Sequence, residues 1–235
     1  MITVRNLSKS YETPGETVEV LKDLELDLAD GSTASIVGPS GCGKTTLLNL
    51  LGALDKPTSG AIEIDGLDIA RLSEPDAAAF RNHRLGFVFQ QHHLLPQLNV
   101  LENVLVPRLS GDWEETAATT QERATELLIK VGLQERLHHL PWQLSGGEKL
   151  RTAVARALIN QPKLILADEP TGSLDPASTD QVADLLLEVN RDQNVTLLVV
   201  THNHGLAKRM EQTFELKTGR LHPLITDHGS PGTPS

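Results

Sequence analysis

One stretch constrains the fold of this chain more than any other: residues 38–46, with the sequence Gly-Pro-Ser-Gly-Cys-Gly-Lys-Thr-Thr. It matches the pattern G-x-x-x-x-G-K-[ST] of a phosphate-binding loop. An apolar segment, Ala34 to Val37, precedes it, and a segment with helical character, Thr46 to Leu51, follows it. In such a loop the backbone N–H groups and the positive end of a helix dipole converge on one point. The stretch therefore predicts a site for the β- and γ-phosphates of a nucleotide.

The residue types within this loop suit a nucleotide. Lys44 supplies a positive charge, and the Thr45 hydroxyl can ligate the Mg²⁺ that bridges the phosphates. Gly41 and Gly43 let the backbone approach the ligand closely. We expect the whole loop to bind nucleotide: Gly38, Pro39, Ser40, Gly41, Cys42, Gly43, Lys44, Thr45 and Thr46. A glycine-rich turn without a ligand is the alternative, and it leaves the Lys-Thr pair and the two flanking segments unexplained.

The composition is that of a globular protein. With 235 residues, of which 39% are hydrophobic, the chain can fill the core of one large α/β domain with a subdomain. Its formal charge of −10 disfavours a nucleic-acid partner.

The sequence also carries expectations about the compartment. A single cysteine, Cys42, cannot form an internal disulfide, and the N-terminus lacks the pattern of a signal peptide. No apolar run approaches the ~20 residues that cross a bilayer. We expect a cytoplasmic chain whose role at a membrane, if it has one, depends on a separate partner.

The N-terminal part predicts an antiparallel sheet with one exposed face. Residues Ile2 to Leu7 and Val18 to Leu28 are expected to form strands, and apolar residues alternate with polar ones in the second. Tyr11 is placed between these strands, before the turn at Pro14-Gly15. Its ring could stack on an adenine base or take part in ordinary packing, and both interpretations stay open.

Three apolar runs predict buried strands of a mostly parallel sheet: residues 85–89, 164–167 and 195–200. Polar residues follow each run, namely Gln90, then Asp168 and Glu169, then His202. Because ligands bind at the carboxyl ends of parallel strands, these side chains are expected at one edge of the sheet.

Each of these polar residues has a candidate role. Asp168 could hold Mg²⁺ through its water shell, and Glu169 could act as the general base toward an attacking water. Carboxylates that only cap the next helix are the alternative. Gln90 could contact Mg²⁺ or the attacking water, and His202 could bond the γ-phosphate. For these two, an ordinary loop residue remains the competing interpretation.

Between Gln91 and about Leu144 the pattern becomes mostly helical, with an amphipathic segment at Glu122 to Val131. We therefore predict an inserted helical subdomain, at about 91–160. The histidine pairs 92–93 and 138–139 are predicted to be surface or capping residues rather than a zinc site, because neighbours in sequence rarely point at one metal.

A second anion-binding element is predicted at Leu144-Ser145-Gly146-Gly147-Glu148. Ser145 is a good N-cap, and the two glycines leave the first N–H groups of the helix bare. A plain capped helix is the alternative. Two phosphate-type sites in one chain suggest a two-fold dimer with ATP between the copies.

With these motifs in order, residues 1 to 222 resemble the ATP-binding subunit of ABC transporters. The resemblance implies the fold of that family: a P-loop NTPase core with a mostly parallel sheet, an antiparallel β subdomain and an inserted α-helical subdomain. It also implies ATP and Mg²⁺ as ligands, ATP hydrolysis, a second ATPase subunit, and a membrane-spanning permease at the cytoplasmic face of the inner membrane. Residues 223–235 are expected to be a disordered tail.

The resemblance assigns roles residue by residue. It implies adenine stacking by Tyr11, a signature motif at Leu144 to Glu148, a dimer contact at Ser173-Leu174-Asp175 and a switch histidine at His202. Metal ligation is implied for Thr45, Gln90 and Asp168, and catalysis for Glu169, His202 and Gln90.

Within the family, the segments around Gln90 and Glu102-Asn103 resemble the group that contains lipoprotein-releasing, macrolide-exporter and cell-division ATPases, and the lipoprotein-releasing branch fits best. Departures from the family pattern are Glu148 for the commoner glutamine, the continuation Lys149-Leu150, and Ser173 and Asn203. None of them removes a catalytic group. Two rival functions are a soluble ABC ATPase that acts on ribosomes or DNA and a P-loop kinase; the kinase leaves the second glycine motif without a role.

Overall fold

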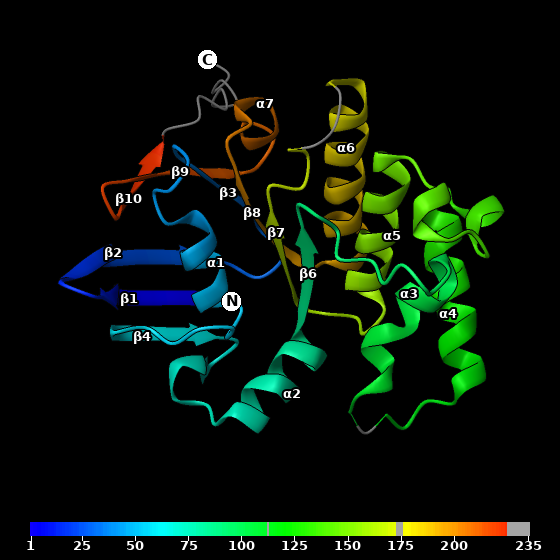
Figure 1. Ribbon diagram of the computed structural model, residues 1–235, viewed down its shortest axis with the longest axis horizontal. Coiled ribbons are helices and arrows are strands. Elements are labelled where there is room, and N and C mark those ends of the chain that lie inside the picture. Colours follow the sequence, from blue (N-terminus) through cyan, green and yellow to red (C-terminus); the bar gives the residue numbers. More distant parts are fainter. Residues whose placement is uncertain (112, 173–175, 225–235) are drawn as a thin grey trace, which may run out of the picture.

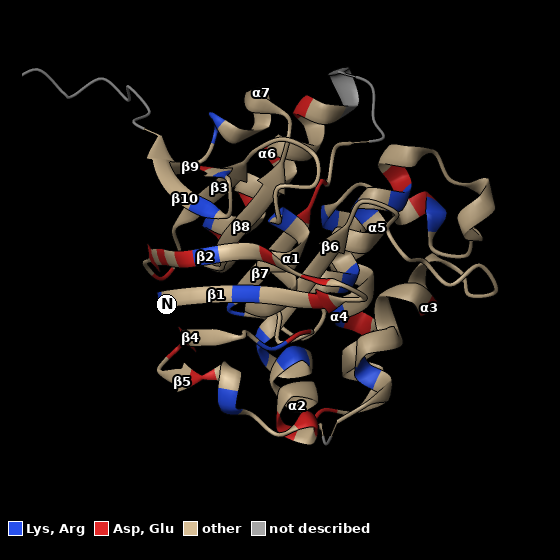
Figure 2. Cartoon of the chain, turned by 60° about the vertical axis from the view of Figure 1, so that its left-hand side comes forward, with Lys and Arg blue, Asp and Glu red and all other residues tan. Residues whose placement is uncertain are grey.

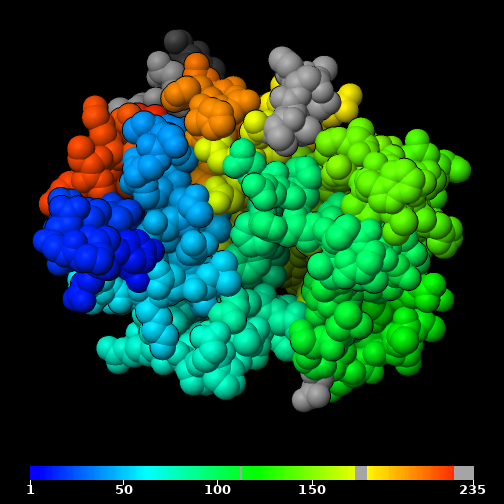
Figure 3. Space-filling view, in the orientation of Figure 1, coloured from blue at the N-terminus to red at the C-terminus, as the bar shows by residue number. Residues whose placement is uncertain are grey.

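The computed structural model describes residues 1–111, 113–172 and 176–224. Figure 1 shows two sheets, one beside the other, with a group of helices, α3, α4 and α5, on the far side of the larger sheet. Figure 3 shows that these helices form a distinct bulge next to the rest of the molecule. The predicted fold class, with its antiparallel sheet, mostly parallel sheet and helical part, is confirmed.

The smaller sheet is antiparallel, with strand order β2-β1-β4-β5. Its strands are β1 (Ile2–Thr13), β2 (Glu16–Leu28), β4 (Ser59–Ile64) and β5 (Leu67–Asp68). Alternation in β2 buries Leu24, Leu26 and Leu28, as predicted. Charged side chains of both signs are interspersed on the outer face (Figure 2), where Arg5 pairs with Asp27 at 2.7 Å.

The prediction that Tyr11 lies between the first two strands was wrong. The β1–β2 ladder continues as far as Thr13 opposite Glu16, so Tyr11 is inside β1, opposite Val18. The two-residue turn at Pro14-Gly15 closes the hairpin so tightly that no longer loop is needed.

The larger sheet has the order β10-β9-β3-β8-β7-β6. Its strands are β3 (Thr33–Val37), β6 (Leu85–Phe89), β7 (Leu164–Asp168), β8 (Thr196–Thr201), β9 (Gln212–Lys217) and β10 (Arg220–Leu224). All neighbours are parallel except β10, which pairs antiparallel with β9. The edge strand β10 was not predicted, because its sequence contains Pro223 and polar residues that only an edge tolerates.

The helices fall mostly where the periodicity places them. They are α1 (Lys44–Leu51), α2 (Glu74–Arg84), α3 (Val100–Leu105), α4 (Ala117–Lys130), α5 (Gly146–Leu158), α6 (Pro176–Gln193) and α7 (His204–Ala207). Short 3₁₀ turns are η1 (Ile69–Arg71), η2 (Val106–Leu109), η3 (Gln134–Arg136) and η4 (Pro141–Gln143). The helix α3 lies within the stretch predicted to be mostly helical, whereas the short helix α7 was not predicted, because so few residues carry no clear period.

The hydrophobic core lies on both faces of the central sheet. Along β7, Leu164 and Leu166 face a cluster with the antiparallel sheet and α1, while Ile165 and Ala167 face a cluster with α3 to α6. Burial on both faces explains why the strand is a continuous apolar run. It also fixes the carboxyl ends of β3, β6, β7 and β8 along one edge.

Three further observations bear on the sequence predictions. Among the described residues, none of the helices combines the length and the apolar character that crossing a bilayer requires. The prediction of a surface or capping role was wrong for His92, which is 6% exposed, because its segment turns inward after β6. The expected tail at 223–235 lies outside the described residues except for its first two, which belong to β10.

Candidate functional site

The loop at residues 38–46 joins β3 to α1 and can be built only with glycine at its tightest points. A Cβ on Gly38 would lie 2.5 Å from the carbonyl oxygen of Leu216, and one on Gly43 would lie 2.9 Å from a methyl carbon of Val20. Gly43 also has a φ of 105°. A side chain at Gly41, in contrast, would meet open space. The glycines thus bring the loop against β9 and β2 and leave its other side open.

Lys44 folds back over this loop. Its ammonium group donates to the carbonyls of Gly38 at 2.9 Å and Pro39 at 3.1 Å, and it lies 3.7 Å from Oε1 of Glu169. The side chain is buried, so the charge is screened little by water. The ammonium group is therefore held where an anion in the loop would meet it.

Thr45 and Asp168 bring together oxygen atoms from α1 and β7. The Thr45 hydroxyl donates to Oδ2 of Asp168 at 3.1 Å, whereas Oδ1 of Asp168 is buried and has no hydrogen-bond partner among the described residues. Burial raises the pKa of Asp168 above its ordinary value, and the nearby Glu169 charge raises it further. An ionised, incompletely paired carboxylate beside a hydroxyl is a donor set that suits Mg²⁺.

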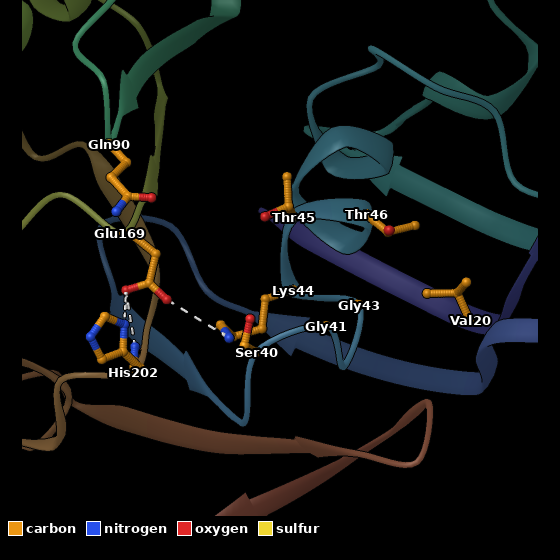
Figure 4. Close-up of a pocket in the computed structure, with 10 residues that line it drawn as sticks. All are labelled: Val20, Ser40, Gly41, Gly43, Lys44, Thr45, Thr46, Gln90, Glu169 and His202. Atoms are coloured by element: carbon orange, nitrogen blue, oxygen red, sulfur yellow. Dashed lines mark hydrogen bonds and ion pairs between the residues drawn. The ribbon is translucent and has the colours of Figure 1, made fainter. Parts of the chain in front are cut away.

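Glu169 and His202 meet at the carboxyl ends of β7 and β8 (Figure 4). Oε2 of Glu169 accepts a hydrogen bond from the backbone N–H of His202 at 3.0 Å and lies 2.9 Å from Nδ1 of the same residue. Its other oxygen faces Lys44. Glu169 has a φ of 45°, an uncommon conformation for a residue with a side chain. The carboxylate is thus held between two potential cations rather than left to rotate.

Lys44, Thr45, Glu169 and His202 line one pocket of about 710 Å³. The lining residues are Val20, Ser40, Gly41, Gly43, Lys44, Thr45, Thr46, Gln90, Glu169 and His202. Figure 4 shows Gln90 and Glu169 facing the phosphate loop from across the pocket. Sequence reasoning missed Val20, since an apolar residue in a hairpin strand carries no signal of its own.

Some predicted site residues lie outside this lining. Gly38, Pro39 and Cys42 form the supporting part of the loop, and Cys42 packs against the apolar core. Asp168 is also outside the lining and is bonded to Thr45, which is part of it. The segment 173–175, predicted to contact a dimer partner, lies outside the described residues.

Tyr11 is near the loop but engaged elsewhere. Its hydroxyl donates to Oδ2 of Asp55 at 2.9 Å, and the ammonium group of Lys9 lies 4.7 Å from the ring centre. Burial and the bond to Asp55 raise the pKa of the Tyr11 hydroxyl. Tyr11 as a whole is 39% exposed, so part of the residue remains accessible to a ligand.

The signature motif forms an N-terminal cap away from the pocket. Ser145 Oγ accepts from the Glu148 N–H at 3.3 Å, and the Glu148 carboxylate accepts from the Ser145 N–H at 2.8 Å. Arg136 donates to the same carboxylate at 2.8 Å. The backbone bond from Ser145, together with Arg136, lowers the pKa of Glu148 to about 2. One chain does not bring Ser145, Gly146, Gly147 or Glu148 to the residues that line the pocket.

Known proteins match this chain over most of its length. The family described as "ABC transporter" matches residues 21–172. Lipoprotein-releasing system ATP-binding protein LolD 1 of Rhodopirellula baltica is 50% identical over 221 residues, which cover 94% of this chain and 96% of the relative. The LolD protein of Geobacter metallireducens is 48% identical over the same length, with 94% and 97% covered.

Solved structures agree with these relatives. The post-hydrolysis dimer of the ATP-binding cassette MJ0796, bound to ADP and Pi, has a TM-score of 0.88 at 38% identity and covers 96% of this chain and 99% of that one. CbiO1 of Clostridium perfringens, part of the ABC transporter complex CbiONQ, has a TM-score of 0.83 at 26% identity, with 94% and 86% covered.

Proposed function

The chain belongs to the ABC transporter family, as an ATP-binding and ATP-hydrolysing subunit, and from this we propose that it powers a lipoprotein-releasing system at the cytoplasmic face of the inner membrane. Its partners in this proposal are a second copy of the chain and a membrane-spanning permease. Relatives that match almost the whole chain are named as lipoprotein-releasing proteins, and these names support lipoproteins as the class of substrate. The observation that carries the catalytic part is the arrangement of Lys44, Glu169 and His202 around one pocket.

We propose that the loop at 38–46 holds the phosphates of ATP. Its backbone N–H groups and the N-terminus of α1 would face the phosphate oxygens, and Lys44 would exchange its carbonyl partners for them. Tyr11 would stack its exposed ring on the adenine.

Hydrolysis in this proposal uses Glu169 as the base. A water molecule attacks the γ-phosphorus and gives a proton to Glu169, the bond to the β-phosphate oxygen breaks, and ADP and inorganic phosphate form. His202 holds the Glu169 carboxylate through two contacts, so the base is oriented before the substrate arrives. Gln90 lies across the pocket, where it would orient the water.

The residues present fit Mg²⁺, because Oδ1 of Asp168 is buried with no partner among the described residues and the Thr45 hydroxyl bonds the other oxygen of the same carboxylate. Thr45, Asp168 and the Gln90 side-chain oxygen would hold the ion. Bound there, Mg²⁺ would neutralise charge on the β- and γ-phosphates.

In this proposal, each subunit of a dimer supplies the second anion-binding element to the nucleotide site of the other. Ser145, Gly146 and Gly147 at the start of α5 form an anion-binding helix terminus that is distant from their own pocket, and Glu148 fixes the cap. We propose that they contact the ATP held by the partner subunit, as a two-fold arrangement requires.

The permease would dock in a groove between the central sheet and the helical part. This permease groove has a volume of about 390 Å³ and is mostly apolar, with a basic rim. Its lining residues are Leu54, Arg81, Asn82, Leu85, Gly86, Phe87, Phe89, His93, Val106, Pro107, Arg156, Ala157 and Asn160. A short amphipathic segment with an acidic side chain would suit it, and the groove reaches His93, three residues after Gln90.

The experiment that tests this proposal is affinity purification of the tagged chain from gently solubilised membranes, with the partner identified by mass spectrometry. We expect a permease with a large extracytoplasmic domain, and the purified complex should release a lipid-anchored protein from reconstituted vesicles when ATP is added. Recovery of soluble partners alone would instead support the rival function, an ABC ATPase that acts on a soluble complex.

A pair of matched variants makes the test specific to the groove. Leu54 is 48% exposed inside the permease groove, and Leu67 is 43% exposed on β5, outside it. Leu54→Glu should abolish recovery of the permease and keep the ATPase activity of the isolated chain, while Leu67→Glu should keep both. Equal recovery of the permease with the two variants would show that it docks outside this groove.

A further inference from the structure

The backbone after Gln90 has an uncommon conformation. His92 and His93 have φ values of 59° and 46°, so two consecutive residues with side chains are left-handed. Each such residue is less stable than in the right-handed form, because its Cβ crowds the carbonyl oxygen that follows. Two backbone bonds, from the His92 N–H to the Phe89 carbonyl at 2.9 Å and from the His93 N–H to the Gln91 carbonyl at 2.7 Å, close the turn. A shape of this kind persists only where its surroundings impose it.

One side chain from another element bonds both histidine carbonyls of this turn. Arg156 of α5 donates from Nη1 to the His93 carbonyl at 2.7 Å and from Nη2 to the His92 carbonyl at 2.5 Å. The planar guanidinium group thus holds both peptide units in one orientation. In the part of the chain that the structure describes, no carboxylate pairs with Arg156, so these two carbonyls are the acceptors that its guanidinium group has.

The backbone of α5 next to Arg156 packs closely against β6. At Gly86 the strand approaches α5 so closely that a Cβ would lie 2.6 Å from the Ala157 carbonyl oxygen. β6 and α5 lie side by side in Figure 1. The ring of His93 also packs edge-on against Phe89, with 5.1 Å between the ring centres. Both ends of the turn are therefore tied to β6 and α5, which pack closely against each other.

We propose that Arg156 is a positioning residue for Gln90: by clamping the carbonyls of His92 and His93 it fixes the loop that presents the Gln90 side chain to the nucleotide pocket. This inference rests on the role proposed for Gln90. It adds a link from α5, the helix that begins at the signature motif, to the pocket of the same chain. Arg156 and His93 also line the permease groove, so a permease segment bound there would contact the clamp directly.

The test uses the full chain and steady-state ATPase measurements. Arg156→Ala should lower kcat by about tenfold, because small displacements of positioning groups have effects of at least that size. The KM for ATP should change by less than about threefold, since the loop at 38–46 is untouched. Arg156→Lys should recover only part of kcat. Its ammonium group can bond a carbonyl, but it cannot hold both carbonyls in a fork. Arg209→Ala, which removes an arginine that bonds the Asp180 carbonyl on α6, should leave kcat unchanged.

A double-mutant cycle with Gln90→Ala separates this inference from the role proposed for Gln90. If Arg156 acts through Gln90, its loss should add almost nothing to the defect of Gln90→Ala. Additive defects, or a normal kcat in Arg156→Ala while Gln90→Ala is impaired, would overturn the clamp and leave the role of Gln90 intact. A normal kcat in Gln90→Ala would overturn that role and the clamp with it.

Hydrogen exchange provides a readout that does not depend on turnover. In folded Arg156→Lys, the amides of His92 and His93 should exchange faster than in the wild type, while those of β7 stay protected. Unchanged exchange at both histidines would show that the turn holds its shape without the arginine, and would contradict the proposal even if Arg156→Ala fails to fold.

Discussion

Asp168 is a residue whose surroundings disfavour its own charge. Burial and the neighbouring Glu169 raise its pKa, and one of its oxygens lacks a partner among the described residues. A carboxyl group whose folded pKa is raised is least costly below its unfolded pKa, and the cost appears as the pH rises through the folded value. At neutral pH without ligand, we therefore expect Asp168→Asn to stabilise the fold by ~1 kcal/mol, or roughly 2–4 °C in Tm for a chain of this size.

This gain should shrink as the pH falls through the raised pKa of Asp168 and should vanish below the ordinary aspartate pKa of about 3.9, where the carboxyl is protonated in both the folded and the unfolded chain. Mg²⁺ with ATP should stabilise the variant less than the wild type. Thermal unfolding at several pH values checks both points. Asp192→Asn, an exposed position on α6, is the matched control and should show no gain. A lower Tm for Asp168→Asn at pH 7 would mean that the charge is compensated in a way the described contacts do not include.

At the scale of elements, two helices begin with the same kind of cap but differ in their proposed function. Ser145 accepts from the N–H three residues ahead in α5 at 3.3 Å, and Ser73 does so in α2 at 3.4 Å. Replacing either with alanine should destabilise the chain by about 0.5–2 kcal/mol. Only Ser145→Ala should also lower kcat, because only its hydroxyl is proposed to contact the nucleotide of the partner subunit.

Chemical denaturation and ATPase assays at matched folded fractions check this pair. If both variants lose stability and neither loses turnover, the start of α5 is a plain capped helix, and the dimer must use other groups around the nucleotide.

At the scale of the whole molecule, binding and hydrolysis should be separable steps of one dimer cycle. Glu169→Gln removes the proposed base and keeps the shape of the side chain, so ATP binding should persist while turnover nearly stops. We expect this variant to accumulate as a dimer with ATP, measured by analytical ultracentrifugation. With ADP, it should return to the monomer.

Lys44→Ala in the same background is the control and should remain monomeric, because the phosphate loop would have lost its ammonium group. Wild-type turnover in Glu169→Gln would contradict the role of Glu169, and an unchanged monomer with ATP would contradict the two-fold arrangement.

Much of the site could be predicted because its signals are local. The glycines of 38–46, the helix cap at Ser145 and the polar residues after apolar runs are patterns within a few positions of each other. The strand ends place Gln90, Glu169 and His202 at one pocket because parallel neighbours share an edge. Their chemical roles remain predictions.

Other features leave no local pattern. Val20 lines the pocket from a hairpin strand, and His92 is buried by a turn that the sequence does not announce. Arg156 bonds carbonyls 63 and 64 positions earlier in the chain, through acceptors that every residue type carries. Backbone acceptors cannot be distinguished in a sequence, so such a clamp becomes visible only in three dimensions.

The sequence by itself determined the phosphate loop, the polar residues at the ends of the buried strands, and the family. These features depend on residue types at short spacings. Tertiary structure alone decided that Tyr11 is held by Asp55 within a strand, that Oδ1 of Asp168 has no partner among the described residues, and that Arg156 of α5 bonds the loop after Gln90. The physical reason is that burial and hydrogen bonding join groups far apart in the chain, and their geometry depends on how the sheet and helices pack.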